Sequence, residues 1–232
     1  MSALIPQIIA GIKQFFLNGF RAFPLVIAVT AFILAFFQTN IAFTLLFVAL
    51  AFVIPLATTG INVILEFILG LTKLDGSLYK VPTTAACTIV GPGGLTATPT
   101  AIFGLPTYWM ASVVFFFSYI AINGISLYMR DADPAADAGR VTARKTQALV
   151  GAGLAIVVGL LFVVVRFMAA NCETGIGFVT ALITMAPLAF GWYKLAALCG
   201  ADRLVDLFGI ANGFLPLSAQ SNQGYVCVPS TD

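Results

Sequence analysis

The sequence predicts an all-α integral membrane protein with about five transmembrane helices and amphipathic interfacial helices at its N- and C-terminal ends. Of the 232 residues, 60% are hydrophobic and only 9% are charged, and the mean hydropathy is +1.04. A soluble domain carries roughly 25% charged residues. With so little charge, a water-exposed surface could not stay largely polar. The medium around these helices is therefore expected to be lipid.

Five apolar segments approach the length of about 20 residues that a helix needs to cross a bilayer. They are residues 22–37, 41–59, 107–129, 148–169 and 175–193. The first is short and contains Pro24. Only Gln38, Thr39 and Asn40 separate it from the second. We therefore expect the first two helices to form a tight antiparallel hairpin.

Amphipathic helices are expected on both sides of this bundle. In residues 1–21, apolar side chains recur at helical spacing, while Gln7, Gln14 and Asn18 fall on the opposite side. Such a helix is best placed flat in the membrane interface. A cleaved signal peptide is the alternative, but no A-x-A site follows. Residues 194–232 predict a second interfacial helix followed by a polar tail.

The longest stretch without clear periodicity is residues 72–106, which is rich in Thr, Gly and Pro. Loops of this length are usually functional, packed or disordered. Because this one retains several large apolar residues, we expect an ordered segment that packs on protein or lies near lipid. Just before it, residues 61–71 either prolong the second helix past the membrane or bend along its surface.

The basic residues and cysteines predict an orientation. Five spans place residues 60–106 and 171–174 on the same side as the N-terminus. Six Lys or Arg residues lie on the opposite side, against five on this one. The positive-inside rule then favours an external or lumenal N-terminus and a cytoplasmic C-terminus. Cys87 and Cys172 share the first side, where a disulfide would suit an oxidising compartment. Four free thiols acting as small hydrophobic groups are the alternative.

Small residues at four-residue intervals predict a helix-packing face on the fourth span. Gly151, Ala155 and Gly159 carry this pattern. Small side chains let two helices approach closely, which is how helices associate in lipid. This is the clearest local mechanism in the sequence, and it is structural.

A polar pathway is the second kind of site to consider, because charges inside a bilayer are costly and suggest function. Glu66 lies in an apolar run, where a carboxylate at the interface is the favoured interpretation. Ser118, Asn123 and Ser126 on the third span could line a polar cavity, although hydrogen bonding between helices is the commoner role. Arg166 lies near the end of its span, where its long stem is expected to reach the headgroups.

The residue inventory argues against catalysis and cofactor chemistry. The chain has no histidine, which removes the commonest metal ligand and proton shuttle. It contains neither a G-x-S-x-G nor an H-E-x-x-H motif, and no carboxylates pair inside a span. The net charge is +2 and no basic patch predicts nucleic-acid binding. We expect no enzyme activity and no cofactor. The expected partners are the lipid bilayer and other membrane subunits or a second copy.

These observations favour a non-catalytic structural or assembly subunit of a membrane or larger membrane complex, an organelle or virion membrane included. Ionisable groups are nearly absent from the spans, whereas helix-packing residues and aromatic side chains, 21 Phe among them, are plentiful. The alternative is a small multi-pass transporter or channel with a polar path near Glu66 and Asn123.

Overall fold

The computed structural model describes residues 19–38, 41–72, 80–81, 102–103, 105–130, 138–170 and 172–199. These ranges are helical apart from short connections and one pair of two-residue strands, β1 (Lys80–Val81) and β2 (Ile102–Phe103), which run antiparallel. Residues 1–18 of the expected interfacial helix, the tail beyond residue 199 and most of the 72–106 loop lie outside the described residues.

The first two apolar segments form α2 (Phe23–Gln38) and a long second helix. That helix consists of α3 (Ile41–Val48), the π-helical turn η1 (Ala49–Val53) and α4 (Ile54–Thr72). Residues 61–71 thus prolong the second helix instead of bending away. At the expected bend, Thr58 donates to Ile54 O at 2.7 Å and Thr59 donates to Pro55 O at 2.8 Å. Such bonds to the preceding turn are compatible with a continuous helix.

The remaining helices are α5 (Tyr108–Met129), α6 (Ala138–Val165), the π-helical turn η3 (Arg166–Ala170) and α7 (Gly175–Leu198). A threonine caps the N-terminus of two of these helices, α5 and α7. Thr107 accepts a hydrogen bond from Met110 N at 3.1 Å, and Thr174 accepts one from Gly177 N at 3.0 Å. A side-chain acceptor at this position satisfies an amide that the helix itself leaves unpaired.

Among the described residues, four helices are long and apolar enough to cross a membrane, and they confirm the predicted all-α membrane fold. They are Ile41–Gly70, Tyr108–Met129, Val141–Met168 and Gly175–Leu198. The first expected span is a shorter apolar helix. Its 16 residues give a length of about 24 Å, against a hydrocarbon thickness of roughly 30 Å.

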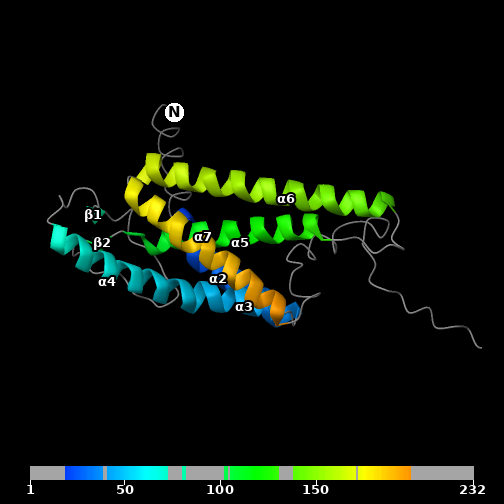
Figure 1. Ribbon diagram of the computed structural model, residues 1–232, viewed down its shortest axis with the longest axis horizontal. Helices are drawn as coiled ribbons and strands as arrows, with labels where there is room; N and C mark the ends of the chain where they lie inside the picture. Colours follow the sequence, from blue (N-terminus) through cyan, green and yellow to red (C-terminus); the bar gives the residue numbers. More distant parts are fainter. Residues whose placement is uncertain are drawn as a thin grey trace, which may run out of the picture.

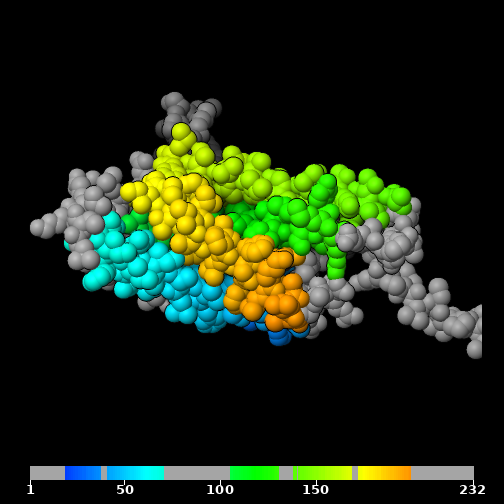
Figure 2. All heavy atoms as spheres, in the orientation of Figure 1, coloured from blue at the N-terminus to red at the C-terminus, as the bar shows by residue number. Residues whose placement is uncertain are grey.

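The helix α5 lies at the centre of the bundle, in contact with α6, α7, α4 and α2 (Figure 1). In the space-filling view, α5 is visible mainly as a strip between α6 and α7 and at its C-terminal end (Figure 2). Successive long helices run in opposite directions (Figure 1). The connection between α6 and α7 and the start of α5 therefore share one end of the bundle.

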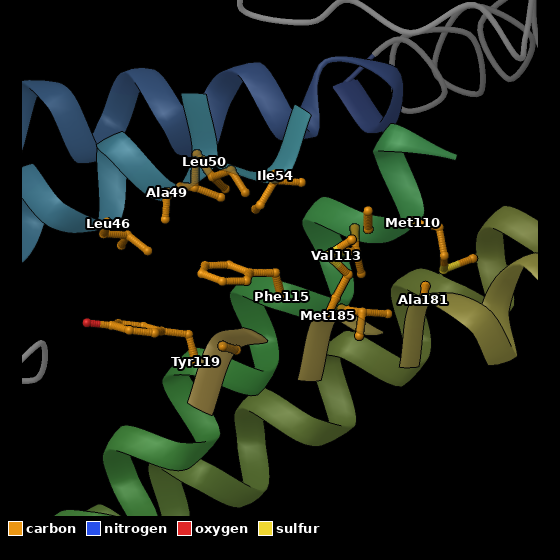
Figure 3. Packing of buried hydrophobic residues seen from close by; sticks show 14 of the residues in the cluster. Leu46, Ala49, Leu50, Ile54, Met110, Val113, Phe115, Tyr119, Ala181 and Met185 are labelled. Carbon is orange, nitrogen blue, oxygen red and sulfur yellow. The ribbon is translucent and has the colours of Figure 1, made fainter. Parts of the chain in front are cut away.

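The interior of the bundle is filled by large apolar side chains. Phe115 and Tyr119 of α5 point toward Leu46 and Leu50 of the long second helix, while Met185 of α7 lies beside α5 (Figure 3). A second group of aromatic rings packs where α2, α5 and α6 meet. It consists of Phe20, Phe23, Trp109, Phe116, Phe117 and Phe162, with ring centroids 4.5–6.4 Å apart.

Candidate functional site

A buried ion pair lies at the end of the bundle where α6 meets α7. Arg166 opens η3, and Glu173 lies in the connection that precedes α7. Arg166 Nε is 3.3 Å from Glu173 Oε1, and the two side chains are 2% and 0% exposed. Thr107, just before α5, donates its hydroxyl to the same carboxylate, with Oγ1 2.7 Å from Oε1 and 2.8 Å from Oε2. The carboxylate thus joins α5, α6 and α7.

Trp109 connects the ion pair to the start of α2. The guanidinium carbon of Arg166 lies 5.0 Å from the centroid of the Trp109 ring, which is within the range of a cation–π interaction. The indole Nε1 donates to Phe20 O at 2.6 Å. Arg166 Nη2 is also buried, and it has no hydrogen-bond partner among the described residues. The guanidinium is therefore only partly satisfied.

The pKa of the Glu173 carboxyl group, which lies in the connection between α6 and α7, differs from its usual value. Burial raises its pKa from 4.5 to about 7, because removal from water disfavours the ionised form. The Thr107 hydroxyl and the Arg166 charge act in the opposite direction, since both favour the carboxylate. Burial outweighs them, so this group changes its protonation state near neutral pH.

The expected position of Arg166 is wrong. Its stem was expected to reach the headgroups, but the side chain is buried against Trp109 and Glu173. Sequence reasoning also did not single out Glu173, Thr107 or Trp109 as functional residues. One signal was available, because Glu173 follows Arg166 by seven residues across a short connection. Opposite charges placed there can pair as the chain turns.

The predicted helix-packing residues lie along α6. Ala155 and Gly159 are buried, and Gly151 is half-buried. A Cβ added at Gly159 would lie 3.0 Å from Phe117 Cβ, so this glycine faces α5. The buried small residues of α6 are Ala148, Ala152, Ala155 and Gly159. Their spacing alternates between four and three because an α-helix has about 3.6 residues per turn, so strict four-residue spacing drifts off the contact face.

The predicted polar-pathway residues do not gather in one place. Glu66 is exposed on α4, Ser118 and Ser126 are half-buried, and Asn123 is fully buried. Tyr193 Oη donates to Ser126 Oγ at 2.5 Å, and the neighbouring Trp192 Nε1 donates to Leu45 O at 3.1 Å. This places the Ser126 end of α5 near Leu45. At about 1.5 Å per residue, Glu66 lies roughly 30 Å further along the same long helix.

The two cysteines that the structure describes, Cys172 and Cys199, lie at opposite ends of α7. Cys172 is buried and disulfide-bonded, next to Glu173 at the α6–α7 connection. Cys87, its predicted partner, lies outside the described residues, so this pairing stays a prediction. Cys199, which follows α7, is a free and exposed thiol.

Among the described residues, no group of three or more Cys, Asp or Glu side chains could hold a metal ion. The described helices define an all-α integral membrane protein. At one end it has a buried ionic cluster, which consists of Arg166, Glu173 and Thr107. No family model, curated protein or solved structure matches this chain. Its function therefore has to be argued from its own residues.

Proposed function

We propose that this chain is a non-catalytic structural or assembly subunit of a membrane complex. The observation that carries the proposal is a bundle interior filled by large side chains, combined with long exposed apolar faces. Trp109, Phe115 and Tyr119 of the central helix are fully buried. In contrast, α6 and α7 present exposed side chains such as Leu154 and Ile183 along their outer faces. These faces suit contact with lipid and with other membrane helices.

A transporter or channel needs a polar path through the bundle. Asn123 and Ser126 lie toward one end of α5, and Ser126 already accepts a hydrogen bond from Tyr193. Glu66 lies roughly 30 Å away along the long second helix. This separation supports the structural proposal, because the residues that would form the path are far apart.

Measurement of particle mass tests the proposal. We expect the protein, purified in mild detergent and placed in nanodiscs, to form particles with more protein mass than one chain of 24.5 kDa. The added mass should come from a stoichiometric partner chain or a second copy. Light scattering with identification of the co-purifying chains measures both.

A single-chain particle that conducts solute would contradict this proposal. The decisive comparison is flux into liposomes for wild type, Glu66→Gln and Lys194→Gln. Lys194 is also an exposed charge, on α7, and serves as the matched control. Solute flux that is lost only in Glu66→Gln would establish transport instead.

We also propose that the α6–α7 connection faces an external or lumenal compartment and that the end of α7 faces the cytoplasm. The disulfide at Cys172 supports this orientation, because disulfides persist in oxidising compartments. Cys199 should then react with a membrane-impermeant maleimide only after the membrane is permeabilised. The Cys199→Ser variant corrects for other thiols. Equal labelling of Cys199 in intact and permeabilised cells would reverse the proposed orientation.

A further inference from the structure

The contact between Arg166 and Glu173 is unusually sparse for a buried ion pair. Arg166 uses only Nε, at 3.3 Å from Oε1, although a guanidinium can donate two parallel hydrogen bonds to a carboxylate. Its Nη2 has no acceptor among the described residues. The Thr107 hydroxyl lies 2.8 Å from Glu173 Oε2. The pair is therefore held by one charged hydrogen bond.

Thr107 can serve both protonation states of the carboxyl group. Its hydroxyl has one proton, yet Oγ1 lies 2.7 Å from Oε1 and 2.8 Å from Oε2. Oγ1 also accepts a hydrogen bond from Met110 N at 3.1 Å, and it retains a second lone pair. A proton on Oε2 would be donated to that lone pair. The carboxyl group can thus gain a proton and keep its contact with Thr107.

Among the described residues, Arg166 has no such alternative partner. A neutral Glu173 no longer balances its charge, and an unpaired buried guanidinium is strongly unfavourable. Arg166 also opens the π-helical turn η3. Turns of this kind are rare and occur often at functional sites, and relaxation to an α-helical turn would rotate the residues that follow.

We propose that Glu173 and Arg166 form a proton-operated latch: a proton taken from water by Glu173 Oε2 releases Arg166, and with it the η3 end of α6, from the start of α5. The latch depends only on the contacts among Glu173, Arg166 and Thr107. It does not require the proposed assembly function and goes beyond it. It would change the shape of one end of the bundle in response to the pH of the compartment that this end faces.

The charged and titratable neighbours of Glu173 in the described residues are few. Arg166 faces it from η3, and Arg21, before α2, acts on Arg166 through its charge. Cys172 is in a disulfide and does not titrate. The chain also has no histidine, the residue that ordinarily titrates near neutral pH. A transition in this range that is lost in Glu173→Gln would therefore come from Glu173 and not from a histidine.

Folding raises the pKa of Glu173 from 4.5 to about 7. The direction of this change gives the sign of the pH dependence of the free energy of unfolding. The folded chain binds this proton more tightly than the unfolded chain. The part of the free energy of unfolding that is linked to this proton is therefore fully present below pH 4.5 and is lost as the pH rises through about 7. It is the difference between the protonated and ionised forms of Glu173, and the ion pair that the ionised form makes with Arg166 still has to be broken on unfolding. The latch should be closed above this range and open below it.

Tryptophan fluorescence tests the latch, because the chain has two Trp residues and Trp109 lies against Arg166. The Trp192→Phe variant in nanodiscs leaves Trp109 as the reporter. We expect its emission to change in one step with a midpoint near the pKa of about 7. Addition of Glu173→Gln should abolish the step, whereas addition of Glu66→Gln should leave it unchanged.

Substitutions at Thr107 keep the test decisive if Glu173→Gln does not fold. Thr107→Val removes the hydroxyl that favours the carboxylate, so the midpoint should move to higher pH. Thr107→Ser retains the hydroxyl and should retain the midpoint. The latch is overturned by a flat titration of Trp192→Phe between pH 5 and 9, by a step that persists in Glu173→Gln, or by a midpoint that Thr107→Val does not move.

Discussion

Replacing Glu173 with alanine is expected to lower the free energy of unfolding by about 3–5 kcal/mol at pH 8.5. The change removes the counter-ion of Arg166, a side chain that is 2% exposed and has no second anionic partner among the described residues. It also leaves the hydroxyl of Thr107 without its acceptor. Unfolding of the detergent-solubilised protein, followed by the loss of helical circular dichroism, measures this cost.

A double substitution separates the lost charge balance from lost packing. Arg166→Met with Glu173→Leu removes both charges and keeps apolar volume, so most of the stability lost in Glu173→Ala should return. Glu66→Ala is the matched control, because Glu66 is an exposed carboxylate on α4. Its effect should stay within about 0.5 kcal/mol. If Glu173→Ala costs no more than Glu66→Ala, the ion pair does not hold this end of the bundle together.

The membrane class and the main helices follow from the sequence because apolar run length is a local property. Each span has to cross the same thickness of hydrocarbon, so it is visible without knowledge of its neighbours. The ends of the helices are less visible. The helix α6 begins at Ala138, ten residues before the apolar segment at 148–169, and α7 continues to Leu198. Polar residues outside the lipid can remain helical, so apolarity marks the membrane and not the helix end.

The ionic cluster was harder to predict because its partners are distant in the chain. Thr107 and Glu173 are separated by 66 residues, and only the packing of α5 against α6 and α7 brings them together. Considered by itself, Arg166 near a span end is explained by a stem that reaches the headgroups. The structure buries it because a carboxylate and an indole ring lie within reach. Burial of a charge thus depends on tertiary partners that local sequence does not show.

Substitution in the interface between α5 and α6 is expected to have the second largest effect on the free energy of unfolding. Gly124→Ala tests this expectation. A Cβ at Gly124 would lie 2.8 Å from Ala148 O and 2.9 Å from Ala152 Cβ. Neither atom is the end of a flexible side chain, so the two helices would have to separate. Overpacking of this kind costs about 1–3 kcal/mol. Because helix association in lipid relies on close packing, thermal unfolding in detergent should register this loss directly.

Gly153→Ala is the matched control, because Gly153 is an exposed residue of α6 and a Cβ there would meet no atom within 4 Å. Alanine is the better helix former by about 1 kcal/mol in an exposed helix, so this variant should be neutral or slightly stabilised. The same chemical change is thus expected to have opposite signs at two glycines. Equal effects at both positions would mean that α5 and α6 are further apart than the structure places them, and that their contact does not depend on the absence of a side chain at Gly124.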